Sequence, residues 1–237
     1  MNCIQHLEVP FELNGVPRIV NPTLIWDDTS AVLIDAGFPG QAPAIRRAIE
    51  AIGIAFNKID MIVVTHLDWD HIGGLADMVT AGQGVEVLAH ELEQPFIQGD
   101  KVFVKAPQRN AAGTAQGQAP LNFPRTRVTK VVGDGDVIDV AGGIDVIHTP
   151  GHTLGHICLY HRHSKTLIAG DALNVVDGKL TGPNPIHTHD MKQGHDSLRK
   201  LANYDIRTVI CYHGGVFNDD TNARIAELAR YTGANSG

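Results

Sequence analysis

Four side chains that could bind a metal ion or transfer a proton fall within six residues of this sequence. The stretch at residues 65–74 reads T-H-L-D-W-D-H-I-G-G, and its candidate ligands are His66, Asp68, Asp70 and His71. It directly follows the apolar run M-I-V-V at residues 61–64, which is typical of a buried strand. Charged groups at the end of a buried strand need a counter-ion, and imidazole and carboxylate groups are common metal ligands. The stretch therefore predicts a metal site.

Other apolar segments of the chain also end in histidine or aspartate. They are followed by His90, by the segment from His148 to His156, by Asp171 and by His213. Strands of one packed core tend to present their ends on a common edge. We therefore expect these side chains to converge with the cluster at residues 66–71, although they lie far away in sequence.

The bulk composition fits one compact domain. The 237 residues show no break in composition, and 43% of them are hydrophobic and 19% charged. The net charge of -7 gives no basic surface that would favour nucleic acid, so nucleic acid is not an expected partner. The partner expected for the predicted site is a small-molecule substrate.

Cysteine usage and the N-terminal sequence bear on the compartment. The three cysteines include no C-x-x-C pair, which argues against a disulfide framework and favours a reducing cytoplasm. The first residues lack the basic and apolar regions of a signal peptide. No apolar run approaches the ~20 residues that span a bilayer. We expect a cytoplasmic protein without a membrane segment.

Periodicity predicts a mixture of strands and helices that supplies these strand ends. The first three expected strands, at residues 3–9, 16–26 and 31–35, are separated by turn formers and are predicted to be antiparallel. Further strands are expected at residues 59–65, 85–89, 126–132, 137–140, 144–148, 157–160, 166–169 and 208–212. Helical spacing appears at residues 42–52, 73–79, 193–204 and 220–231.

Residues 91–125 interrupt this pattern with several prolines and little periodicity. A long irregular stretch inside a compact domain is usually functional, so we interpret it as a lid-like or substrate-binding insertion. A plain surface excursion is the alternative. Its apolar residues could also form part of a homodimer interface.

In their order and spacing these motifs resemble the metallo-β-lactamase superfamily. Its signature is H-x-H-x-D-H, followed by G-H-T-x-G-H, a bridging aspartate and a late histidine. Here these elements correspond to residues 66–71, residues 151–156, Asp171 and His213, and the resemblance extends over residues 16–220. It implies an α/β fold, a four-layer αββα sandwich of two similar halves with metals at the edge of the sheets.

The resemblance also implies a ligand set for two divalent metal ions. The first ion would be held by His66, Asp68 and His152, the second by Asp70, His71 and His213, and Asp171 would bridge both. Zinc is the expected metal, with iron or manganese as alternatives.

Asp68 departs from the commonest family pattern, because it stands where the second histidine is expected. A carboxylate is a harder ligand than imidazole and adds a negative charge. The consequence is a weakened first site, a different metal preference, or a binuclear centre of greater carboxylate character. A binuclear centre of greater carboxylate character would resemble the flavin-linked diiron branch of the superfamily, whose motif is H-x-E-x-D-H. The flavodoxin-like domain of that branch is not found in this sequence, so we expect hydrolysis rather than iron-based redox chemistry.

The function that this resemblance implies is metal-dependent hydrolysis. A hydroxide held between the metals would attack an ester, lactone, thioester or amide, with a phosphodiester as a close variant. Asp70 would orient the water, and Asn174 could donate a hydrogen bond to an oxyanion, although the lactonase branch carries a tyrosine at that place. A nonhaem iron oxidoreductase, of diiron or persulfide-dioxygenase type, is the alternative, and a non-catalytic binding protein is a third hypothesis.

Several other residues are expected to support the site rather than form it. We expect His156 to hydrogen-bond behind the metals and Asp35 to accept backbone donors in a nearby turn. Cys211 is predicted to be a buried small hydrophobe. His187 and His189 are either an additional metal or substrate contact or residues at the lip of the site.

Overall fold

The computed structural model describes residues 2–13, 15–82, 84–102 and 125–230. Most of the predicted insertion, residues 103–124, lies outside the described residues. The part of the insertion that is described contains a short helix, α4 (Gln94–Ile97), which the sequence pattern does not predict.

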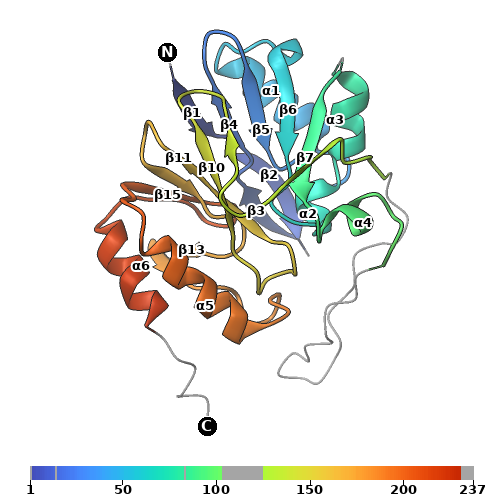
Figure 1. Ribbon diagram of the computed structural model, residues 1–237. Helices are drawn as coiled ribbons and strands as arrows, with labels where there is room; N and C mark the ends of the chain where they lie inside the picture. Colours follow the sequence, from blue (N-terminus) through green and yellow to red (C-terminus); the bar gives the residue numbers. More distant parts are fainter. Residues whose placement is uncertain (1, 14, 83, 103–124, 231–237) are drawn as a thin grey trace.

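Two six-stranded sheets form the centre of the described structure (Figure 1). In spatial order, the first contains β1 (Cys3–His6), β4 (Thr23–Trp26), β5 (Ala31–Ile34), β6 (Ile59–Val63), β7 (Glu86–His90) and β8 (Lys130–Val132). The second contains β16 (Gly215–Phe217), β15 (Thr208–Cys211), β12 (Thr166–Ile168), β11 (Ile157–His161), β10 (Ile144–His148) and β9 (Val137–Ile138). Two small hairpins accompany them, β2 (Val9–Leu13) with β3 (Val16–Val20) and β13 (Asn174–Val176) with β14 (Lys179–Thr181).

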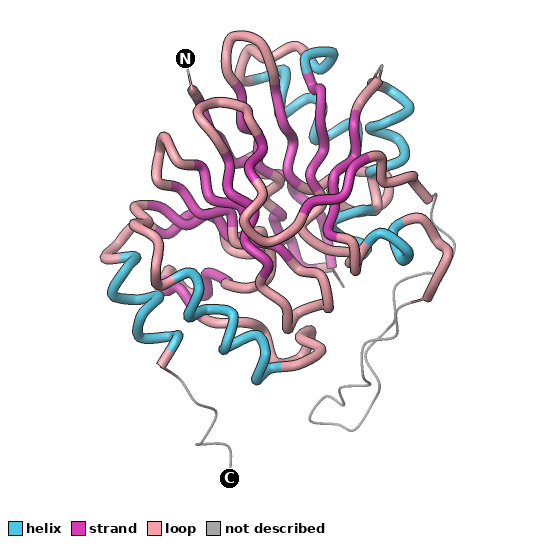
Figure 2. The backbone as a smooth tube through the Cα atoms, in the orientation of Figure 1, coloured by secondary structure: helices cyan, strands magenta, loops and turns pink. Residues whose placement is uncertain are grey.

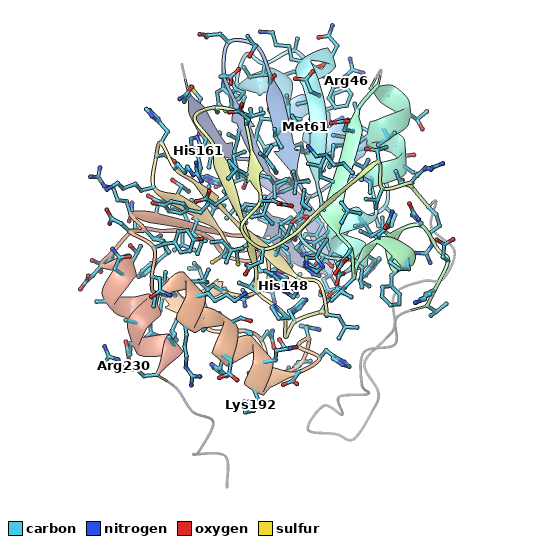
Figure 3. All side chains as sticks on the ribbon, in the orientation of Figure 1. Arg46, Met61, His148, His161, Lys192 and Arg230 are labelled. Carbon is cyan, nitrogen blue, oxygen red and sulfur yellow. The ribbon has the colours of Figure 1, made fainter. Side chains whose placement is uncertain are left out.

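An apolar core lies between the two sheets. Val63 and Leu88 of the first sheet belong to one buried cluster with Val146, Leu159 and Ile168 of the second. The alternation of side chains along each strand leaves the opposite face of each sheet for the helices. Side chains fill the space between the layers (Figure 3).

Helices cover the outer face of each sheet, as the tube in Figure 2 shows. Ile45 and Met78 bury their side chains in one cluster with Ile62 of the first sheet, and Leu198 and Ile225 do so with the second sheet. The helices are α1 (Ala42–Ala51), η1 (Phe56–Lys58), α2 (Trp69–Ile72), α3 (Leu75–Ala81), α4, α5 (Met191–Leu201) and α6 (Thr221–Ala229). The four layers confirm the αββα sandwich predicted above.

Parallel pairing brings the ends of several strands to one edge. In the first sheet β5, β6 and β7 are parallel, and in the second β12 is parallel to β15. The carboxyl ends of parallel strands lie on the same side of a sheet. This places the residues after β5, β6, β12 and β15 close together.

One predicted strand is divided in two. The expected strand at residues 16–26 consists of β3 and β4, which belong to different sheets. Pro22 between them has no backbone N–H to donate to a neighbouring strand, and the buried Asn21 instead donates from its side chain to the Tyr212 carbonyl oxygen at 2.9 Å.

Among the described residues, no helix combines the length and the apolar character that crossing a membrane requires.

Candidate metal centre

The ligand motif is shaped by a short helix that follows β6. Asp68 has extended backbone angles and directly precedes α2, whose single turn carries Asp70 and His71. Gly73 and Gly74 follow, and a Cβ at either residue would lie 2.3 Å from a backbone atom, at Pro39 and Ala36 respectively. The glycines are therefore required for the turn to pack against the loop that follows β5.

The first group of side chains, His66, Asp68 and His152, contains residues from both sheets. The Nε2 atom of His152 lies 3.0 Å from Asp68 Oδ2, and the Nε2 atom of His66 lies 3.5 Å from the same oxygen. One potential ligand atom from each of the three residues lies within 4.8 Å of the others. The geometry is that of a half-buried three-ligand group.

A second group lies beside it. His213 Nε2 is 3.2 Å from Asp70 Oδ2, and His71 Nε2 is 3.8 Å from that oxygen. These three residues also place their ligand atoms within 4.8 Å of one another. His213 follows β15, so this group again combines residues from both sheets.

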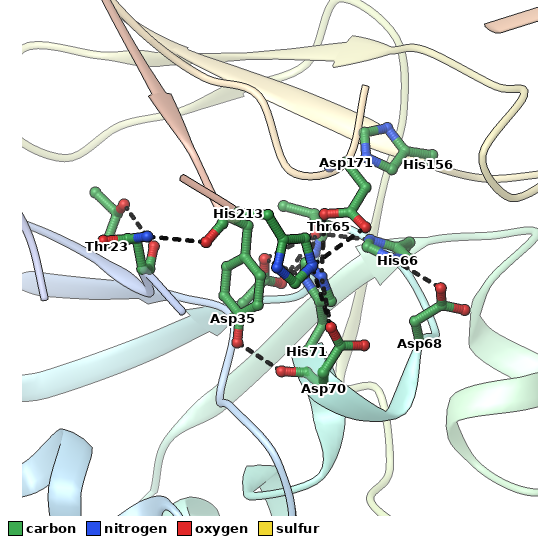
Figure 4. A network of polar contacts seen from close by, with 12 residues as sticks. Thr23, Asp35, Thr65, His66, Asp68, Asp70, His71, His156, Asp171 and His213 are labelled. Carbon is green, nitrogen blue, oxygen red and sulfur yellow. Dashed lines mark hydrogen bonds and ion pairs between the residues drawn. The ribbon is translucent and has the colours of Figure 1, made fainter. Parts of the chain in front are cut away.

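Asp171 stands between the two groups (Figure 4). Its Oδ1 atom is 3.3 Å from His71 Nε2, whereas its Oδ2 atom is 3.4 Å from His152 Nε2 and 3.5 Å from His213 Nε2. Because one carboxylate faces histidines of both groups, Asp171 has the position expected of a bridging ligand. The structure thus brings together all seven residues that the sequence predicts as ligands.

Three polar atoms at the centre of this cluster have no hydrogen-bond partner within the described structure. They are His66 Nε2, His71 Nε2 and Asp171 Oδ1, and all three are buried. A buried polar atom without a partner costs free energy, whereas a cation placed among imidazole nitrogens and carboxylate oxygens would satisfy all three. The residues present therefore fit a metal centre.

The charges of the cluster perturb its histidines strongly. Burial lowers the pKa of His71, but Asp35, Asp171 and Asp70 outweigh burial and raise it well above its usual value. For His213, Asp171 and Asp70 likewise overcome burial and raise the pKa to about 10. Burial, with the neighbouring His71, holds the pKa of His66 well below its usual range.

Asp35 supports the cluster from the end of β5. It accepts hydrogen bonds from the Thr65 N–H and from His71 Nδ1, both at 2.8 Å. The first bond confirms the predicted role as an acceptor of backbone donors. The second, which the sequence does not predict, directs the Nε2 atom of His71 at the site, because the donor hydrogen is held on Nδ1.

His156 supports Asp171 in the predicted manner. Its Nε2 atom accepts the backbone N–H of Asp171 at 3.0 Å, so its hydrogen resides on Nδ1, which lies 2.9 Å from Thr149 Oγ1. His156 belongs to none of the three-residue groups that could hold a metal in the described structure. The expected hydrogen bonding behind the site is confirmed.

Tyr212 and Glu93 are two supporting residues that the sequence motifs do not reveal. The Tyr212 hydroxyl donates to the Asp70 carbonyl oxygen at 2.5 Å, and its ring lies 3.8 Å from that of His71. Glu93 accepts the backbone N–H groups of Leu67 and Gly155, and burial raises its pKa to about 7. Their partners are mainly backbone groups, which leave no spacing signature.

The remaining predicted residues belong to neither of the two ligand groups in the described structure. Asn174 begins β13 and donates from Nδ2 to the Gly182 carbonyl oxygen at 3.3 Å, and the same nitrogen carries a second hydrogen. Cys211 is fully buried, as predicted. His187 and His189 belong to none of the metal-binding groups among the described residues, but the His189 N–H donates to the His152 carbonyl oxygen at 3.2 Å.

Comparison with known proteins places this geometry in a family. The sequence profile of the metallo-beta-lactamase superfamily matches residues 15–213. A probable metallo-hydrolase, YflN of Bacillus subtilis (strain 168), is 32% identical over 203 residues, which cover 78% of this chain and 75% of the relative. A hydroxyacylglutathione hydrolase of Ectopseudomonas mendocina (strain ymp) is 29% identical over 208 residues, which cover 81% of this chain and 66% of that protein.

Solved structures agree with the sequence relatives. The crystal structure of a metallo-beta-lactamase family protein from Thermus thermophilus is similar with a TM-score of 0.70 and 26% identity, covering 95% of this chain and 78% of the other. The ligand motifs, the αββα layers and the matched profile lead to one conclusion. The chain belongs to the metallo-beta-lactamase superfamily.

Proposed function

We propose that the chain uses two divalent metal ions to hydrolyse a small molecule. The bond that is cleaved would be an acyl bond, that of an ester, lactone, thioester or amide. The observation that carries the proposal is the position of Asp171, whose carboxylate faces histidines of both ligand groups. Two cations that share this carboxylate would be bound by both groups at once.

The proposed ligands follow the two groups. One ion would be held by His66, Asp68 and His152, the other by Asp70, His71 and His213, and Asp171 would be shared. Zinc is the proposed metal, because four imidazole nitrogens suit it better than they suit magnesium or calcium.

The metals, when bound, would acidify water and polarise the carbonyl group that is attacked. The protein's own residues supply orientation and proton transfer. The side chain of Asp70 is 14% exposed and its Oδ2 atom lies 3.2 Å from His213 Nε2, so this carboxylate is proposed to accept a hydrogen bond from the attacking water. The second amide hydrogen of Asn174 is proposed to bind the oxyanion.

Metal removal tests this proposal. The protein would be treated with a chelator and assayed with ester, lactone, thioester and phosphodiester substrates before and after Zn²⁺ is restored. We expect turnover of at least one acyl substrate to disappear on chelation and return with Zn²⁺. Hydrolysis that persists in protein shown by elemental analysis to be metal-free would contradict the proposal.

An iron-dependent oxidoreductase is the second candidate, and Asp68 is the observation that favours it. With His66 and His152, Asp68 forms a group of two histidines and one carboxylate, the donor set of many nonhaem iron enzymes. Metal analysis of protein purified without added metal, together with oxygen consumption, distinguishes the candidates. Iron with substrate-dependent oxygen uptake would favour oxidation, and zinc without oxygen uptake would favour hydrolysis.

A further inference from the structure

Glu93 is a buried acidic residue outside the ligand motifs. It precedes helix α4, and its exposed fraction is 0%. A carboxylate in such surroundings is costly unless both of its oxygens accept hydrogen bonds. Both oxygens do: Oε2 accepts the Leu67 N–H at 2.8 Å, and Oε1 accepts the Gly155 N–H at 2.6 Å.

The two N–H groups belong to the two loops that carry the first ligand group. Leu67 lies between His66 and Asp68 in the loop after β6, whereas Gly155 lies three residues after His152 in the loop between β10 and β11. The loops come from different sheets. Glu93 therefore links, through one side chain, the backbone segments that position all three members of this group.

The contact at Gly155 leaves no room for a side chain. A Cβ there would lie 2.9 Å from Glu93 Cγ, 3.0 Å from Glu93 Oε1 and 2.9 Å from His90 Nδ1. The carboxylate thus lies directly against the peptide backbone of the loop. This accounts physically for the glycine of the G-H-T-L-G-H segment at residues 151–156.

The second ligand group is held by different residues. Asp35 fixes His71, and the Tyr212 hydroxyl binds the backbone of Asp70. The described structure records no hydrogen bond from Glu93 to the loop at residues 69–72 or to His213. The groups share one support, because Thr65 Oγ1 lies 3.0 Å from His66 Nδ1 and 3.3 Å from His71 Nδ1, whereas the hydrogen bonds of Glu93 reach only the loops of the first group.

We propose that Glu93 is a positioning residue for the His66, Asp68 and His152 group, and that it sets the metal affinity of this group without affecting the second. The inference rests on the proposed function, because it assumes that both groups bind metal ions. It goes beyond that function by assigning a site-selective role to a residue that is itself no ligand.

The effect of Glu93 on the metal affinity of each ligand group is measured separately, in two variants that each keep only one of the groups intact. His213→Ala leaves the first group intact, and Asp68→Ala leaves the second intact. Glu93→Gln is introduced into both, because glutamine keeps the length of the side chain but turns an amide donor toward one of the two N–H groups. Zn²⁺ affinity is measured in competition with a chromophoric chelator, and Co²⁺ absorption spectra report the ligand geometry.

We expect Glu93→Gln to weaken Zn²⁺ binding by about 10- to 100-fold in the His213→Ala background. In the Asp68→Ala background the affinity should change by less than about twofold, since the second group lacks this support. The Co²⁺ spectrum should change only in the His213→Ala background. Glu91→Gln, at an exposed neighbouring position, is the matched control and should leave both affinities unchanged.

Equal losses in both backgrounds would overturn the proposal, because they would show a general effect on folding. An unchanged affinity in the His213→Ala background would overturn it as well. If Glu93→Gln does not fold, Gly155→Ala disturbs the same contact from the opposite side and should show the same selectivity. Zn²⁺ binding by the unmodified protein is measured first, so that failure of the proposed metal centre is recognised separately.

Discussion

At the scale of single residues, Asp68 distinguishes this site from the pattern that its motif resembles. Its Oδ2 atom faces His152 and His66 at 3.0 and 3.5 Å, so the carboxylate occupies a ligand position rather than pointing into solvent. With Asp70 and Asp171 it gives the cluster three carboxylates beside four histidines. The first group is therefore harder and more negative than a group of three imidazoles would be.

Asp68→His tests whether this carboxylate sets the metal preference. Imidazole favours zinc over manganese more than a carboxylate does, so we expect the Zn²⁺ to Mn²⁺ affinity ratio of the first group to rise by about tenfold. The measurement is a competition titration in the His213→Ala background. An unchanged ratio, with unchanged activity in the otherwise native chain, would show that Asp68 does not determine the character of the site.

The ligand residues could be predicted from the sequence, whereas most of their supports could not. Histidines and aspartates after apolar segments indicate residues 66–71, the segment from His148 to His156, Asp171 and His213, and the family resemblance assigns the ligand roles among them. Glu93 and Tyr212 act on backbone groups of loops far away in sequence. Such contacts depend on how the two sheets pack, which no local pattern encodes.

At the scale of elements, the loop at residues 149–156 is packed tightly against helix α5. Gly151 has a φ of 137°, and a Cβ there would lie 2.2 Å from the backbone nitrogen of Gly194 in the helix. The Asp190 N–H donates to the Gly151 carbonyl oxygen at 2.9 Å, which joins the start of α5 to the loop. The position of His152 thus depends on a helix that contributes no ligand.

Gly151→Ala is expected to destabilise the fold and weaken metal binding together. The steric overlap and the backbone angle should cost at least about 2 kcal/mol of unfolding free energy. Gly133→Ala is the control, because its Cβ would meet only Asp136 Oδ2, at 4.0 Å, and should change stability by less than about 0.5 kcal/mol. Urea unfolding of both variants provides the measurement, and equal stabilities would refute this packing argument.

Element prediction fails where tertiary contacts override the local pattern. The strand expected at residues 16–26 divides at Pro22, and the residues of the ligand motif form the short helix α2. A single helical turn is too short to show periodicity, so α2 and α4 could not be recognised from the sequence.

At the scale of the molecule, metal ions would connect the two halves of the sandwich. His66, Asp68, Asp70 and His71 follow β6 of the first sheet, whereas His152, Asp171 and His213 belong to loops of the second. Each ligand group contains residues from both sheets. Metal binding should therefore stabilise the whole fold, because the ligands are brought together only in the folded chain.

The stabilisation of the fold by metal binding should increase with pH. In the metal-free fold the pKa of His213 is raised from 6.5 to about 10, so protonated His213 stabilises that fold fully below pH 6.5. The contribution is lost as the pH rises toward 10. Metal ions bind only the neutral imidazole, so their apparent affinity rises over the same range.

We expect the difference in melting temperature between metal-loaded and chelated protein to widen between about pH 6 and pH 9. Calorimetry at constant free Zn²⁺ provides the measurement. The His213→Ala variant is the control and should show a smaller pH dependence. A difference that stays constant or narrows would contradict the assignment of His213 as a ligand.

We propose above that seven side chains hold two metal ions that act together in hydrolysis. The most direct test is to restore Zn²⁺ stepwise to chelated protein while hydrolysis of an acyl substrate and bound metal are measured in the same samples. We expect full activity to be reached at about two ions per chain, the number that two ligand groups with one shared carboxylate would hold. Full activity in metal-free protein, or a chain that binds no Zn²⁺, would contradict it.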